Sequence, residues 1–108
     1  MEIVLIDTFI VPEKSKSEFS AKVKQSADYL RTLPGYVEGF VYEKTEGDSP
    51  HNLVTTAVWE SEEAFGPARK AAAAHFQQVG FNPQEVVKRL EVEMKRAFIE
   101  DRHTDVYS

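Results

Sequence analysis

The stretch HNLVTTAVWESEEAF, residues 51–65, decides the fold of this 108-residue chain. Its first part alternates with a period of two and is rich in β-branched residues, which predicts a strand from His51 to Glu60. Ser61 can then cap a helix, since two glutamates occupy the first turn, where the helix dipole favours negative charge. The only tryptophan of the chain, Trp59, lies at this corner. Such a ring can fill the core or form one wall of a pocket, and the sequence leaves both roles open.

The same patterns predict the other elements on either side of this corner. A helix begins at Ser15, because Ser15 and Glu18 fit a capping box. A loop rich in turn formers at 46–50 makes a hairpin of two strands. Gly66-Pro67 predicts a break or kink early in the second helix, since a proline removes a backbone donor. The predicted elements are strands at 2–11, 36–45, 51–60 and 91–99, helices at 15–33 and 61–79, and a short third helix after residue 82.

The order β-α-β-β-α-(α)-β is that of a ferredoxin-like split βαβ unit. We therefore expect an α+β fold with a four-stranded antiparallel sheet, in a single domain over residues 1–101, followed by a polar tail at 102–108. The strands are apolar on both faces, whereas the helices can cover only one face. An exposed apolar surface of that size predicts a homodimer in which two sheets face each other.

Composition excludes several classes of function. The chain has no cysteine, and its three histidines are far apart, so we expect neither disulfides nor a metal site. The net charge of −5 argues against a nucleic-acid partner, which calls for a basic surface. The apolar N-terminal stretch has no basic n-region and is too short to span a membrane. A soluble, cytoplasmic protein is the expectation.

The corner TAVWESEEAF, residues 56–65, resembles the signature of the antibiotic biosynthesis monooxygenase family, a branch of the dimeric α/β-barrel proteins. Leu33-Pro34-Gly35-Tyr36 and Ala74-His75-Phe76 also match, and the resemblance extends over about residues 2–100. It implies that molecular oxygen oxidises a small aromatic phenol or quinol without a cofactor, in a pocket between the sheet and the helices. That chemistry needs a base for the phenol and polar groups that hold the oxyanion in a dry cavity. A dimeric barrel without catalysis, which binds a small hydrophobic ligand, is the alternative.

Three residues are candidates for catalysis. Trp59 matches the family tryptophan at the strand end, and His75 matches a histidine often found on the second helix. Asp7 interrupts an apolar strand, so its charge must face a cavity, where it can be a base, or pair with a basic residue such as Arg96. His75 can instead lie at the edge of an apolar stripe, hydrogen-bonded or in contact with water. These alternatives stay open in the sequence.

The candidate substrate contacts are mainly aromatic. The alternation predicts that Tyr36, Phe40 and Tyr42 point to the same side of their strand, where they can hold a substrate or form core or interface. Phe65 lies on the apolar stripe of the second helix. Arg69 can stabilise an anion or lie on a solvated helix face.

The haem-degrading branch of the family uses an asparagine in the first strand and a tryptophan in the second helix. In this chain the first-strand position is Asp7 or Thr8, and residues 66–69 of the second helix contain no tryptophan. Haem is therefore not the expected substrate. A helix rises about 1.5 Å per residue, so a straight second helix carries His75 roughly 20 Å from Ser61. We predict that a break at 66–67 redirects the helix across the sheet, so that His75 and Trp59 approach one pocket from two directions.

Overall fold

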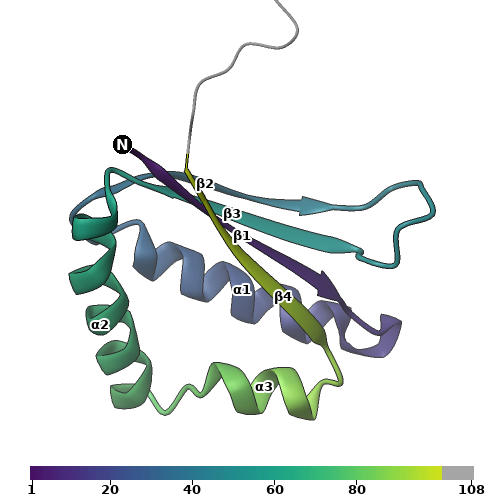
Figure 1. The fold of residues 1–108 in the computed structure, drawn as a ribbon. Helices are drawn as coiled ribbons and strands as arrows, with labels where there is room; N and C mark the ends of the chain where they lie inside the picture. Colours follow the sequence, from purple (N-terminus) through teal and green to yellow (C-terminus); the bar gives the residue numbers. More distant parts are fainter. Residues whose placement is uncertain (101–108) are drawn as a thin grey trace, which may run out of the picture.

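A four-stranded antiparallel sheet with the strand order β2-β3-β1-β4 carries the helices on one side (Figure 1). The computed structural model describes residues 1–100. The ferredoxin-like α+β fold predicted from the sequence is confirmed, and the predicted tail at 102–108 lies outside the described residues. The elements are β1 (Ile3–Ile10), the 3₁₀ helix η1 (Glu13–Ser15), α1 (Lys16–Leu30), β2 (Tyr36–Glu43), β3 (Leu53–Trp59), α2 (Glu62–Gln78), α3 (Pro83–Arg89) and β4 (Glu93–Glu100).

The start of α2 forms as its sequence predicts, but the start of α1 does not. The Ser61 hydroxyl accepts a hydrogen bond from the Ala64 amide at 3.1 Å, which caps α2. The predicted capping box at Ser15 is wrong, because this side chain makes no cap hydrogen bond. Its buried hydroxyl instead donates to the Leu90 carbonyl at 2.9 Å. Ser15 therefore connects the start of α1 to the end of α3.

Helix α2 is continuous, so the predicted break at Gly66-Pro67 is wrong. Pro67 is the sixth residue of the helix, and its missing N–H removes only one helical hydrogen bond, next to a turn whose amides lack helical partners in any case. The cap at Ser61 holds the first turn in place. An unbroken α2 carries His75 away from the corner at Trp59.

The core consists of two clusters at opposite ends of the helix-covered face. One contains Phe9, Val11, Phe19, Leu53, Val86, Leu90 and Val92. The other contains Leu5, Ala57, Trp59 and Ala68. The space between them remains incompletely filled. Among residues 1–100, every helix is too short or too polar to cross a membrane.

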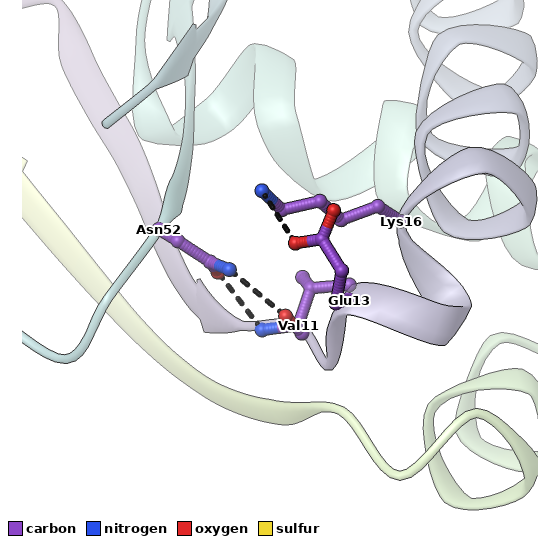
Figure 2. A network of polar contacts seen from close by, with 4 residues as sticks. All are labelled: Val11, Glu13, Lys16 and Asn52. Carbon is purple, nitrogen blue, oxygen red and sulfur yellow. Dashed lines mark hydrogen bonds and ion pairs between the residues drawn. The ribbon is translucent and has the colours of Figure 1, made fainter. Parts of the chain in front are cut away.

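Asn52 hydrogen-bonds to the backbone of Val11, just beyond the end of β1 (Figure 2). Its side-chain amide accepts a hydrogen bond from the Val11 N–H and donates one to the Val11 carbonyl, both at 2.8 Å. This pairing extends the contact between β1 and the β2–β3 hairpin beyond the strand ladder. The ion pair between Lys16 and Glu13 beside it is exposed and contributes little to stability.

The register corrects the expected orientation of the aromatic residues of β2. A bulge between Tyr36 and Glu38 shifts the pairing by one residue. Tyr36 lies opposite Trp59, on the helix side, whereas Phe40 lies opposite Thr56 on the other face. The three aromatic residues were predicted to share one face. Tyr36 instead lies on the helix side, whereas Phe40 and Tyr42 lie on the other face.

The helix-free face of the sheet is apolar. Phe40 and Tyr42 are each 51% exposed on it. By register they share this face with Val4, Ile6, Val54, Val58 and Ile99. Apolar patches of this kind are typical of protein interfaces.

We predict that this face forms a homodimer, so light scattering at micromolar concentration should give twice the chain mass of 12.3 kDa. Phe40→Glu places a charge in the contact and should shift the population towards monomer. Val79→Glu is the matched control, since Val79 is 56% exposed at the end of α2. A wild type that stays monomeric at these concentrations contradicts the prediction.

Candidate functional site

A cavity of about 220 Å³ lies between the two core clusters. Its floor is the sheet, one wall is α1, and the other wall is the segment from the end of α2 to α3. Most of its lining is apolar and includes Leu5, Phe9, Phe19, Val23, Phe76 and Phe81. Its polar side chains are Asp7, Lys22, Ser26, Arg31, Tyr36, Thr55 and Arg96, together with Thr56 at the border. An apolar space with few polar groups is the usual form of a small-molecule site.

Asp7 is the buried charge of the cavity, with 7% of its surface exposed. Arg96 lies directly opposite on β4 and donates two hydrogen bonds, from Nε to Oδ1 at 2.8 Å and from Nη2 to Oδ2 at 3.0 Å. The sequence left a cavity and a pair with Arg96 as alternatives for Asp7, and both are found. The bidentate contact fixes the carboxylate and the guanidinium in the cavity wall.

Tyr36 lies against the second core cluster and reaches the cavity. Its ring packs edge-on against Trp59, with centroids 5.5 Å apart. A Cβ built on Gly39 would lie 2.5 Å from the Tyr36 hydroxyl and 2.6 Å from the Thr56 carbonyl oxygen. Only a glycine leaves room for this hydroxyl. Sequence reasoning missed Gly39, although a glycine inside a strand often marks such a close approach.

Trp59 fills the core behind Tyr36. It is 1% exposed, contacts Phe65 as well as Tyr36, and does not line the cavity. Its indole Nε1 has no hydrogen-bond partner among residues 1–100. The geometry gives Trp59 the packing role, and its neighbour Tyr36 is the residue that lines the cavity. A direct role in catalysis stays a prediction.

His75 also lies outside the cavity lining. Its half-buried ring stacks on Tyr29, with centroids 3.8 Å apart and planes at 4°. The next residue, Phe76, is the one that lines the cavity. His75 and Trp59 therefore do not meet at this cavity, because the unbroken α2 separates them. A catalytic role of His75 stays a prediction without a contact to support it.

The remaining candidates are divided between the cavity and the outer surface. Phe40 borders the cavity although its register position is on the helix-free face, whereas Tyr42, Phe65 and Arg69 do not line it. The Arg69 guanidinium lies over the rings of Phe65 and Phe98, at 6.0 and 5.8 Å. Residues 1–100 contain no group of three side chains arranged to hold a metal ion.

Two basic residues line the cavity from the side of the first helix: Lys22 in α1 and Arg31 directly after it. Lys22 directly precedes Val23, and Arg31 directly follows Leu30, so each flanks the apolar stripe. Flanking positions on a helix lie at the border of its buried face, where long side chains reach a cavity. The position of Lys22 and Arg31 next to the apolar stripe was therefore the signal in the sequence that they could reach a cavity.

Comparison with known proteins extends this description. SnoaB, a cofactor-independent oxygenase from Streptomyces nogalater, matches with a TM-score of 0.69 and 23% identity over 95% of each chain. A mutant of MhuD with two manganese protoporphyrin IX bound per active site matches with a TM-score of 0.71 and 21% identity, over 98% of this chain and 99% of that one. A conserved protein from Methanosarcina mazei Go1 has a TM-score of 0.73 and 17% identity over 94% of each chain. At these identities the likeness shows the fold.

The family itself follows from the sequence match. No curated protein sequence matches the chain. The family model described as antibiotic biosynthesis monooxygenase matches residues 2–79, which include β1, α1, the β2–β3 hairpin and α2. The match covers well over half of the chain and contains Asp7, Tyr36, Trp59 and His75. The chain belongs to the antibiotic biosynthesis monooxygenase family.

Proposed function

We propose that this chain is a monooxygenase that oxidises a small aromatic phenol or quinol with molecular oxygen and without a cofactor. One observation carries the proposal: a fixed, buried carboxylate, Asp7, lies in the wall of a cavity that is otherwise mainly aromatic and aliphatic. Family membership and the likeness to the oxygenase SnoaB support the reaction class. The mainly apolar lining of the cavity favours such a reaction, which proceeds best with little water.

Asp7 is the proposed proton acceptor. A phenolic hydroxyl that hydrogen-bonds to its carboxylate can transfer a proton, and the resulting phenolate is richer in electrons than the phenol. Arg96 holds the carboxylate, and the N–H groups of its guanidinium that Asp7 does not use can stabilise negative charge on the substrate. The Tyr36 hydroxyl is a further donor on the cavity wall.

The reaction balances without an added reductant. Oxygen adds to the ring carbon opposite the phenolate oxygen and forms a peroxide. The hydrogen of that carbon leaves as a proton, the O–O bond breaks, and the outer oxygen leaves as water. One phenol and one O₂ thus give one quinone and one water, and the substrate supplies all the electrons.

Oxygen consumption with 1-naphthol tests the proposal. The protein is treated with a metal chelator, and no flavin is added. We expect catalytic uptake of oxygen with one 1,4-naphthoquinone formed for each O₂ consumed. If 1-naphthol binds while the rate of oxygen uptake stays at the background level, the monooxygenase proposal fails for this class of phenol.

The second candidate is a barrel that binds a small hydrophobic ligand and does not catalyse. Its supporting observation is that both oxygens of Asp7 already accept hydrogen bonds from Arg96. To accept a proton from a substrate, a carboxylate held in this way needs either a free lone pair that faces the substrate or the displacement of Arg96. The oxygen assay above separates this candidate from the enzyme.

Haem is not the substrate that we propose, although MhuD carries a protoporphyrin. Asp7 is engaged by Arg96, and His75 stacks on Tyr29 instead of lining the cavity. Titration with haem should therefore give no sharp Soret band, and no loss of haem should follow the addition of a reductant. A stoichiometric Soret band with haem breakdown contradicts this expectation.

A further inference from the structure

The cavity has a charge opposite to that of the whole chain. The chain carries 18 acidic and 13 basic residues. Among residues 1–100, the cavity lining contains Lys22, Arg31 and Arg96 but only one acid, Asp7. A basic site in an acidic protein favours anionic ligands, because the local charge decides what a small cavity accepts.

Two of these three cations already have partners. Arg96 is neutralised by Asp7 through two hydrogen bonds. Arg31 contacts Asp28 at 3.4 Å, and its side chain is 55% exposed. In a ligand complex neither charge is fully available.

Lys22 differs from both. Within residues 1–100, no carboxylate lies at ion-pair distance from its ammonium group. Glu18, one turn earlier, is bound by Arg89, whose hydrogen bond lowers the pKa of Glu18, with only a minor contribution from the charge of Lys22. The Lys22 ammonium lies 5.8 Å from the centroid of the Phe81 ring, on the opposite wall of the cavity. It is thus a cation at the edge of an aromatic space, with its charge available.

The size of the cavity limits the ligand. An apolar cavity of about 150 Å³ is known to hold benzene. A space of about 220 Å³ therefore fits a molecule of about two rings. Phe76 and Phe81, whose rings meet edge-on at 5.2 Å, offer such a molecule an apolar surface directly beside Lys22.

We infer that the cavity takes aromatic compounds that carry a carboxylate, and that Lys22 binds this carboxylate. The inference rests on the proposed function, since it names the class of substrate for the same cavity. The ring lies against Phe76 and Phe81, and the carboxylate accepts hydrogen bonds from the Lys22 ammonium. Lys22 is a binding residue here, and Asp7 remains the proposed base.

Calorimetric binding of a matched pair of ligands tests the inference without any turnover. The ligands are 2-naphthoate and 2-naphthalenemethanol, which share the ring system and differ in charge. At low salt the wild type should bind the carboxylate about tenfold more tightly or better, since a hydrogen bond to a charged group contributes about 1.5–3 kcal/mol. Raising the salt concentration should reduce this preference.

Variants on α1 assign the preference to one side chain. Lys22→Met should abolish the difference between the two ligands, and Lys22→Arg should keep most of it. Lys24→Met is the matched control, because Lys24 lies on the same helix, is exposed and does not line the cavity. It should behave as the wild type does.

Three results would overturn the inference. They are equal binding of the two ligands by the wild type, an undiminished preference in folded Lys22→Met, and binding of neither ligand. Because the ligands are not oxidised, a carboxylate preference lost only in Lys22→Met supports the inference even if the oxygen assay fails. An active enzyme without the preference would overturn the inference alone.

Discussion

Replacing Asp7 with asparagine should lower the turnover of 1-naphthol by about 10²-fold or more, the usual effect of losing a general base. Asparagine keeps the size of the side chain and can still accept a hydrogen bond from Arg96, but it cannot accept the phenolic proton. Binding of 2-naphthalenemethanol should change little, because the cavity keeps its shape. Initial rates of oxygen uptake and calorimetry on the same preparation measure both effects.

The Asp7→Asn variant leaves the Arg96 charge without its carboxylate, which can destabilise the fold. The double variant Asp7→Asn with Arg96→Gln removes that charge and should fold, yet remain as slow as the single variant. Arg96→Gln alone keeps the carboxylate but not its orientation, so its rate should fall between those of the wild type and Asp7→Asn. If folded Asp7→Asn retains turnover within about threefold of the wild type, Asp7 has a structural role only.

Replacing Trp59 with alanine should cost about 3–5 kcal/mol of unfolding free energy, the range for large aromatic residues in a core. Trp59 is 1% exposed and packs against Tyr36 and Phe65, so its loss leaves a cavity at the end of the sheet. For a domain of this size the melting temperature should fall by roughly 12 °C or more. Denaturant unfolding followed by circular dichroism measures the change.

Trp59→Phe separates packing from chemistry. Phenylalanine keeps an aromatic contact with Tyr36 and removes the indole N–H, which lacks a partner within residues 1–100. An unsatisfied buried donor costs about 1–3 kcal/mol, so its removal partly offsets the lost packing. We therefore expect the free energy of unfolding to fall by only about 1 kcal/mol. Turnover should stay within a few-fold of the wild type. A stable Trp59→Phe protein that loses 10²-fold in turnover contradicts the packing role and supports a direct one.

The parts of the fold that depend on local sequence could be predicted. The alternation in β3 and the helical spacing in α1 are local signals, and so are the caps at Ser61 and Asn82. Both caps form, the second through a hydrogen bond from the Glu85 amide at 3.2 Å. A pair between Asp7 and Arg96 could be anticipated because a charge inside an apolar strand needs a partner.

The errors concern contacts between residues far apart in the chain. Ser15 fits a local cap, but the carbonyl that accepts its hydroxyl belongs to Leu90, 75 residues away. The orientation of Tyr36 depends on a bulge, which is a property of the pairing between two strands and not of the alternation within one. The expected break at Pro67 is a different kind of error, since the cap at Ser61 was predicted correctly and a proline six residues after it removes only one helical hydrogen bond.

A crystal structure of the protein with 1-naphthol, grown without oxygen, tests the central claim most directly. We predict that the ring occupies the cavity between the sheet, α1 and the segment from the end of α2 to α3. The naphthol hydroxyl should lie about 2.6–3.2 Å from a carboxylate oxygen of Asp7, the distance that proton transfer requires. A naphthol bound in this cavity with its hydroxyl turned away from Asp7, or one bound elsewhere while the cavity stays empty, would contradict the proposed active site.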